Sequence, residues 1–215
     1  MGSLKNDTNA ISELRNTSME NVGEGFFSML DTALDLLPYI GQLNQTRKIN
    51  RATIHIEQYS KELQKIQQLM GITRLSSEYY KEKIGPIFIE DFINEHENAK
   101  IVYLLNGYQN VFIEELQHES LVYLYFDILR GLRYGDIRRL FFHADLDDIY
   151  PPTGELDDIQ RMAFTQGLDL KLENLGLINV PITMGNDGTK SRNPETKQLL
   201  TEVGDNFIKF INKTN

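Results

Sequence analysis

Apolar residues recur at three- and four-residue spacing along most of the chain, which predicts a mainly α-helical protein. After a polar segment that ends near Met19, a first helix is predicted from about Glu20 to Leu37. Its apolar face is formed by Val22, Phe26, Leu30, Ala33, Leu34 and Leu37. Pro38 and Gly41 are expected to end this helix and to turn the chain.

The clearest period lies in the next predicted helix, where apolar residues alternate between steps of three and four. These heptad residues are Ile49, Ala52, Ile56, Tyr59, Leu63, Ile66 and Met70. Such a seam requires a helical partner. The preceding helix, folded back as a helical hairpin, is the favoured partner because its own apolar face needs cover. In the alternative, a coiled-coil homodimer, the seven residues face another copy of the chain.

Helical periodicity restarts after Met70 and continues to about Leu129. Ser76 or Ser77 is a predicted N-cap, and Pro86 is predicted to mark a boundary or a kink. The boundary between two domains is placed near residues 117–120. The predicted organisation is therefore a loose N-terminal segment (1–19), a helical domain (20–118) and a C-terminal domain (119–215).

The end of the chain has the order helix, glycine, strand, polar loop, strand, helix. A helix near Glu155–Leu175 is followed by Gly176 as its C-cap, and "LINVPI" and "KQLL" are predicted to be short strands. Thr201 is predicted to cap a last helix with four inward-facing residues, Val203, Phe207, Ile208 and Ile211. The predicted fold is thus mainly α, with a helical hairpin and bundle followed by a winged-helix-like module that carries a small β-hairpin.

A winged helix raises the question of DNA binding, which can be examined by charge. The chain has a formal net charge of −9. Residues 154–175, which would include the recognition helix, carry five acidic and two basic residues, a net of −3. DNA binding relies on basic side chains that neutralise phosphates, so this charge disfavours a nucleic-acid partner. If the module does bind DNA, the predicted contacts are Gln160, Arg161, Gln166, Lys190 and Arg192.

Catalytic and metal-binding motifs are weak. The chain has no cysteine, which excludes disulfides, thiolate metal sites and cysteine nucleophiles. Glu115 and His118 have the Glu-x-x-His spacing of di-iron bundles, but a second such pair is missing. No nucleophile elbow, P-loop or dinucleotide fingerprint is present. We therefore expect no enzyme activity, no cofactor and no metal site.

The stretch from Phe26 to Ile40 is the longest apolar one, but Asp31 and Asp35 interrupt it, and it is too short to span a bilayer. It is interpreted as a core helix and a turn, with insertion into a membrane as an alternative. The first residues have neither a basic start nor an apolar core of the kind found in signal peptides, and Met1–Ser3 can equally be an expression scar. A cytoplasmic location without a stable membrane anchor is expected.

Three stretches resemble a loose group of bacterial helical proteins, the Abi-alpha-like and related uncharacterised proteins found near phage-defence genes. The stretches are "LLPYIGQLN" together with the basic heptad helix after it, "FIEDFINEHENAKIVYLLNGYQNVFIEE" and "LYFDILRGLRYGDIRRLF". The matching positions are Glu95 or Glu97, Lys100, Leu129, Leu132, Asp136 and Ile137. The resemblance covers about residues 26–211 and carries over no catalytic residue. It implies a bacterial or phage protein that acts through contacts and is linked to phage defence.

Together these observations predict a non-enzymatic protein that binds a protein partner or associates with itself. The alternatives are a winged-helix DNA-binding regulator and, less favoured, a membrane-active effector.

Overall fold

The computed structural model describes residues 42–179 and 196–213, with side chains from residue 50 onward. The predicted first helix, residues 20–37, and most of the predicted hairpin tip lie outside these ranges. The described chain is mainly helical, with one small antiparallel pair of strands near its end, as predicted. It divides into two compact units, the first ending at Phe126 and the second beginning at Asp127. This division falls inside helix α7 (Glu119–Gly131), whereas the sequence placed the boundary at the start of that helix.

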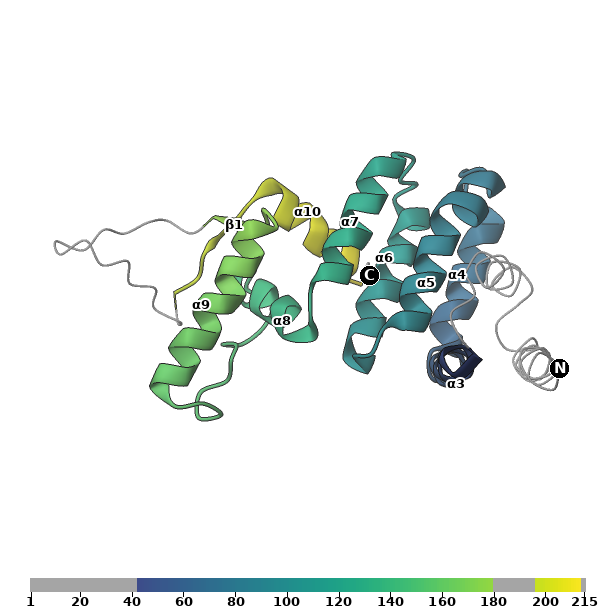
Figure 1. Ribbon diagram of the computed structural model, residues 1–215. Helices are drawn as coiled ribbons and strands as arrows, with labels where there is room; N and C mark the ends of the chain where they lie inside the picture. The colour runs from purple at the N-terminus through teal and green to yellow at the C-terminus, as the bar shows by residue number, and fades with distance from the viewer. Residues whose placement is uncertain (1–41, 180–195, 214–215) are drawn as a thin grey trace. The chain divides into compact units, whose positions relative to one another are not determined.

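Unit 1 is a helical bundle built from five further elements (Figure 1). They are α3 (Gln42–Gln58), α4 (Ser60–Ile72), the π-helical turn η1 (Tyr79–Ile84), α5 (Gly85–Asn94) and α6 (Asn98–Ile113). Helices α4, α5 and α6 pack side by side, and α3 crosses one end of them (Figure 1). The long predicted heptad helix is therefore two helices, which separate at Tyr59, where the backbone leaves helical geometry (φ −114°, ψ 26°).

Helix α6 lies at the centre of unit 1, because side chains on most of its surface are buried. Ile101, Leu105 and Tyr108, which the helical period placed on one face, are inaccessible to solvent. The Tyr108 ring stacks on Phe88 of α5, with centroids 4.1 Å apart and planes 3° from parallel. Helices α4 and α5 both pack on α6, and the residues buried there include the polar side chains of Lys100, Gln109 and Asn110.

The predicted boundary near Pro86 is confirmed, in the form of a change of helix type. Ser76 is the N-cap of the helical stretch that begins at Ser77 and continues into η1. Its Oγ accepts a hydrogen bond from the backbone N–H of Tyr79 at 3.2 Å. Pro86 lies in the first turn of α5 and has no N–H to continue the hydrogen bonds of the helical turn before it, which accounts for the change of helix type at this point. In the preceding π turn, the carbonyl of Tyr80 accepts from the N–H of Gly85 and from the Tyr108 hydroxyl at 3.0 Å.

Unit 2 contains the end of α7, then α8 (Tyr134–His143), α9 (Asp158–Asn174), β1 (Ile178–Asn179), β2 (Leu199–Leu200) and α10 (Glu202–Ile211). The strands pair antiparallel, with Ile178 opposite Leu200. The core of the unit is made by inward residues of the helices and of β1, among them Leu140, Leu172 and Phe207. The segment that joins the two strands includes residues 180–195, which lie outside the described ranges.

The predicted end of α9 is confirmed in detail. Gly176 takes a left-handed conformation (φ +70°), which costs glycine little. The N–H of Leu177 donates to the carbonyl of Leu172, and that of Gly176 to the carbonyl of Glu173, both at 2.9 Å. These two bonds form a Schellman motif, which satisfies carbonyls at the end of the helix and turns the chain into β1.

The predicted start of α10 is also confirmed, since the Thr201 Oγ1 accepts from the N–H of Gly204 at 2.9 Å. Phe207, Ile208 and Ile211 are buried as predicted, but Val203 is exposed, so its inward placement was wrong. Gly204 takes the inward position instead. A Cβ at Gly204 would lie 2.0 Å from the carbonyl oxygen of Leu177. The first turn of α10 thus packs directly on the backbone that leads into β1, and only glycine leaves room for this contact.

Candidate functional site

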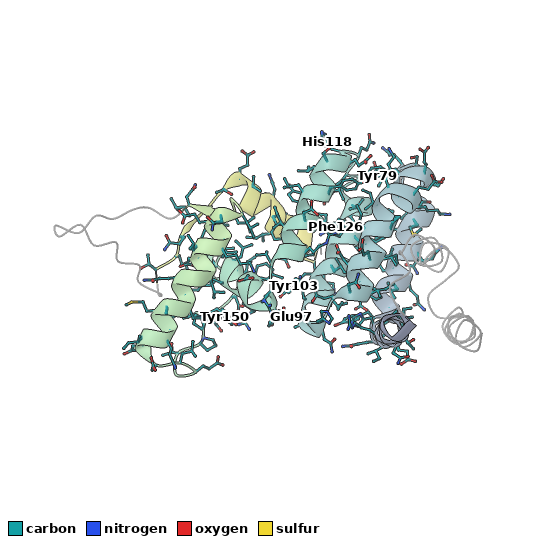
Figure 2. The ribbon with its side chains drawn as sticks, viewed as in Figure 1. Tyr79, Glu97, Tyr103, His118, Phe126 and Tyr150 are labelled. Carbon is teal, nitrogen blue, oxygen red and sulfur yellow. The ribbon has the colours of Figure 1, made fainter. Side chains whose placement is uncertain are left out.

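The most polar buried place in the described chain is a cluster in unit 2 around Arg139 and Asp169. Arg139 belongs to α8 and Asp169 to α9, and both are inaccessible to solvent. The guanidinium donates through Nε to Oδ1 at 2.7 Å and through Nη2 to Oδ2 at 2.9 Å. Its Nη1 donates to the carbonyl of Tyr150 at 2.9 Å. Tyr150 lies on the segment between α8 and α9 (Figure 2), so this one side chain ties three parts of the unit together.

His143, one turn after Arg139 on α8, completes the cluster. Its Nε2 lies 2.9 Å from Oδ1 of Asp169, and its Nδ1 lies 3.1 Å from the backbone N of Gln198. Because the Gln198 N–H can only donate, Nδ1 must accept, and the proton of the neutral ring sits on Nε2. The cluster therefore fixes the tautomer of His143 and fastens the approach to β2 onto α8.

Burial sets the charge states of this cluster. Burial lowers the pKa of His143, and the charges of Arg139 and Lys197 lower it further, against the opposing effect of Asp169. Burial by itself would raise the pKa of Asp169. The hydrogen bonds from His143 and Arg139 outweigh that effect and hold the pKa below its ordinary value. At neutral pH the cluster thus contains a charged Arg139–Asp169 pair and a neutral His143.

Two cations contact the neighbouring ring of Phe142. The Cζ of Arg139 lies 4.7 Å from the ring centroid, and the Nζ of Lys197 lies 5.4 Å from it. Lys197 also forms an ion pair with Asp145. Besides Asp169 of α9, a buried acid lies on α8. This residue, Asp136, accepts from the backbone N–H of Arg133 at 2.6 Å and forms an ion pair with Lys171 of α9. Helices α8 and α9 are therefore joined by two separate ionic contacts.

The Asp169–His143 pair resembles the acid–base part of a catalytic triad, but its geometry does not suit catalysis. In a triad the acid orients one ring nitrogen while the other faces the nucleophile. Here the second nitrogen, Nδ1, is occupied by the Gln198 N–H, and the side chain of His143 is fully buried. Neither nitrogen can exchange a proton with a substrate. The cluster joins α8 to α9, to the segment that carries Tyr150 and to the approach to β2.

Three comparisons, with models of known protein families, with curated proteins and with solved structures, find no match to this chain. The resemblance to the Abi-alpha-like proteins stays a prediction. The matching positions have structural roles that can be described. Glu95 Oε2 forms a 2.8 Å ion pair with the buried Lys100, and its Oε1 accepts from the backbone N–H groups of His96 and Glu97. Asp136 is the buried acid described above.

The residues predicted to contact DNA are placed only in part, because Lys190 and Arg192 lie outside the described ranges. Gln160 takes part in a capping box, in which its N–H donates to Asp157 Oδ1 at 2.8 Å. Arg161 pairs with Asp158 at 2.9 Å, and its own side chain is only 15% exposed. Gln166 is exposed. Of these three residues on α9, the single cation is already neutralised by the helix that carries it.

The outward surface of α9 is apolar, a feature that the charge count did not bring out. Four large apolar side chains of this helix are exposed: Ile159 (82%), Met162 (46%), Phe164 (44%) and Leu170 (51%). Ile159, Ala163, Gln166 and Leu170 step by four, three and four residues and are all exposed. We call these four residues, with Met162, the α9 outer face. The signal in the sequence is this second apolar stripe, which lies apart from the buried residues Thr165, Leu168, Asp169 and Leu172.

The heptad residues of α3 and α4 are covered within unit 1. Ala52, Ile56, Leu63, Ile66 and Met70 are all buried, and the two helices that carry them pack on α5 and α6. Tyr59 is partly exposed and donates its hydroxyl to the carbonyl of Asn98 at 2.9 Å. The side chain of Ile49 lies outside the described side chains. The described part of this seam therefore faces the chain's own helices.

The Glu-x-x-His pair lies in a loop, because α6 ends at Ile113 and α7 begins at Glu119. Glu115 has a positive φ of 47° and accepts from the backbone N–H of Arg74 at 3.2 Å. Tyr79 and His118 lie at the same end of unit 1 (Figure 2). Among the described residues, no three His, Asp or Glu side chains gather as metal ligands would.

A shallow hollow of about 290 Å³ opens beside this loop, lined by Arg74, Leu75, Ser76, Tyr79 and Gln117. The Tyr79 hydroxyl donates to the carbonyl of Leu116 at 2.8 Å. Burial, with help from the nearby Glu119, raises the pKa of Tyr79 to about 12. The phenol stays protonated near neutral pH and does not act as a base there.

Within the described ranges, no helix has both the length and the apolar character needed to cross a bilayer. The stretch Phe26–Ile40, to which the membrane hypothesis refers, lies outside those ranges.

Proposed function

We propose that this chain is a non-enzymatic protein-interaction protein that binds its partner through the α9 outer face. The observation that carries the proposal is the exposure of Ile159, at 82%, within a stripe of apolar and uncharged residues three turns long. Exposed apolar stripes of this kind are costly in water and are typical of surfaces that another protein covers. The closed Asp169–His143 pair supports the non-enzymatic part of the proposal.

We further propose that residues 119–215 have a winged-helix-like arrangement. The order α7, α8, α9, β1, β2, α10 supports it, as does the antiparallel pairing of the two strands after α9. In such a module α9 has the position of the recognition helix. Its outer face offers isoleucine, methionine, alanine, glutamine and leucine in place of basic side chains, and Arg161 is paired with Asp158. This composition favours a protein partner over DNA. A winged-helix-like fold does not contradict that choice, because a fold alone does not determine function.

Site-specific photo-crosslinking tests the proposal. A photoreactive amino acid is placed at Met162 (46% exposed), on the α9 outer face, and separately at Ile72 (79% exposed), an even more accessible apolar position at the end of α4. In cells that express the protein, we expect discrete cross-linked species from position 162 and none from position 72. Equal labelling from both positions, or none from either, would contradict the proposal.

A second measurement separates this function from DNA regulation. Fluorescence anisotropy of a labelled random duplex is followed as the full chain is added at low and at physiological salt. We expect no binding tighter than the ordinary non-specific range of about 10⁻⁴–10⁻⁶ M at physiological salt. Tighter binding that weakens when Lys190 and Arg192 are neutralised would make the chain a DNA-binding protein instead.

A further inference from the structure

The surroundings of the α9 outer face are acidic, and this acidity bears on the kind of partner that fits. Glu155, Asp157 and Asp158 lie at the start of α9 and are exposed, and the side chain of Asp158 is 94% exposed. The two basic residues of the same segment already have acidic partners. Arg161 pairs with Asp158, and Lys171 pairs with the buried Asp136. Arg161 offsets one of these three acids, so the N-terminal end of the apolar stripe keeps a net charge of −2.

The spacing of the stripe points to the shape of the partner. Steps of four, three and four residues between Ile159, Ala163, Gln166 and Leu170 are those of a two-helix seam. The small side chain of Ala163 lets a second helix approach closely, and the polar Gln166 in the middle of the seam fixes its register. A straight, convex helix surface of this length is suited to one amphipathic helix of about three turns.

From these two observations we infer that the α9 outer face binds a basic amphipathic helix of another protein. This inference rests on the proposed function and adds the chemical class of the partner. The apolar side of the partner helix covers Ile159, Met162 and Leu170, and its lysine or arginine side chains lie near Glu155, Asp157 and Asp158. Opposite charges around an apolar contact guide association and exclude wrongly charged partners.

A second copy of the chain fits this surface poorly. If two α9 helices pair in parallel, their acidic starts lie together and repel each other. If they pair antiparallel, each acidic start meets a helix end whose only base, Lys171, is held by Asp136. An anionic membrane and DNA are disfavoured for the same electrostatic reason.

The test uses the full chain and three labelled synthetic peptides of 18 residues each. One is an amphipathic leucine–lysine helix, the second has the same composition in scrambled order, and the third replaces lysine with glutamate. Binding is measured by fluorescence anisotropy at physiological salt. We expect the amphipathic basic peptide to bind and the other two to bind at least about tenfold more weakly, which is the loss expected when one central contact is removed.

Variants of the chain locate the binding. Ile159→Glu and Ala163→Glu are expected to weaken the basic peptide about tenfold, and Glu155→Lys is expected to weaken it severalfold. Ile72→Glu, at a 79% exposed position of unit 1, serves as the matched control and should change nothing. All four positions are exposed, so circular dichroism should show an unchanged fold and an unchanged melting temperature.

Several results would overturn the inference: equal binding of the scrambled or acidic peptide, or no effect of Ile159→Glu and Ala163→Glu. So would a dimer in light scattering that Ile159→Glu dissociates, since the occupant would then be a second copy. Failure of this inference can be told from failure of the proposed function. Cross-links from position 162 without peptide binding keep the function and reject the basic helix. Absence of both rejects the two together.

Discussion

Arg139 and Asp169 form a two-point ion pair with no access to solvent, although thirty positions of sequence separate them. The two N–O distances are 2.7 and 2.9 Å, and the side chains are 0% and 1% exposed. Removing two charges from water is costly, so such a pair is sustained only where further hydrogen bonds complete it. Tyr150 and His143 supply those bonds. The pair therefore fixes α8 against α9 in one arrangement and thereby holds the outer face of α9 toward solvent.

Asp169→Asn leaves the buried guanidinium of Arg139 without a counter-charge. We expect the free energy of unfolding of unit 2 to fall by about 3 kcal/mol or more, as measured by urea denaturation. Asp127→Asn, which breaks the exposed pair with Arg130, is the control and should cost less than about 1 kcal/mol. Equal losses of unfolding free energy from the two substitutions would show that the buried pair stabilises unit 2 no more than an exposed pair does.

His143 should make stability depend on pH on the acidic side. Its pKa is lowered in the folded protein, so the unfolded chain binds the proton more readily. The stabilising contribution is therefore complete above the unfolded value of about 6.5 and decreases as the pH falls below it. We expect the stability advantage of the wild type over His143→Gln to shrink between pH 7.5 and pH 5. NMR titration of the ring should give a pKa below 6.5, and a pKa at or above that value would refute the assignment.

Two glycines should respond to alanine in opposite ways. At Gly204 a Cβ would lie 2.0 Å from the carbonyl oxygen of Leu177, so Gly204→Ala must displace α10 from β1. A loss of about 1–3 kcal/mol or more is expected from this overpacking. At Gly167, inside α9, a Cβ meets nothing within 4 Å, so Gly167→Ala should stabilise the helix by up to about 1 kcal/mol. Thermal melts of both variants test the pair, and a neutral Gly204→Ala would contradict the close approach.

The half-buried Glu95 forms an ion pair with the buried Lys100 in unit 1, and their side chains are 16% and 7% exposed. Burial by itself would raise the pKa of Glu95, but hydrogen bonds from Lys100 and from two backbone N–H groups lower it overall. Glu95→Gln leaves the ammonium unpaired and should cost about 3 kcal/mol in urea unfolding. The double substitution Glu95→Gln/Lys100→Met removes the buried charge as well and should recover part of that loss. A double variant no more stable than the single one would argue against the unpaired charge as the cause.

Local features of the chain were predictable where a residue acts on its immediate neighbours. Three helix ends follow from the backbone groups that such an end leaves without partners: Gly176 after α9, Thr201 before α10, and a cap at Ser76 or Ser77, which the structure places at Ser76. Val203 was misplaced because helical period alone does not show how closely two backbones approach. The contact with Leu177 gives that inward position to Gly204.

The buried cluster was not predicted, although a signal for it exists. Asp169 lies three residues before the buried Leu172, on the inward side of α9, and an acid there requires a partner. The identity of that partner depends on how α8 crosses α9. The spacing of residues within each helix does not reveal that crossing. The charge count over residues 154–175 treated Asp169 as a surface acid, whereas the cluster neutralises it.

The sequence by itself determined the helical character of the chain, the ends of its last helices and the burial of the described heptad residues other than Tyr59. Each of these depends on spacing within one helix or on the hydrogen bonds of a helix end. Only the tertiary structure decided which helices cover the heptad seam, which charges are paired and which side of α9 is exposed. Those outcomes depend on contacts between residues far apart in the chain, such as His143 with Gln198, and are set by how whole helices pack.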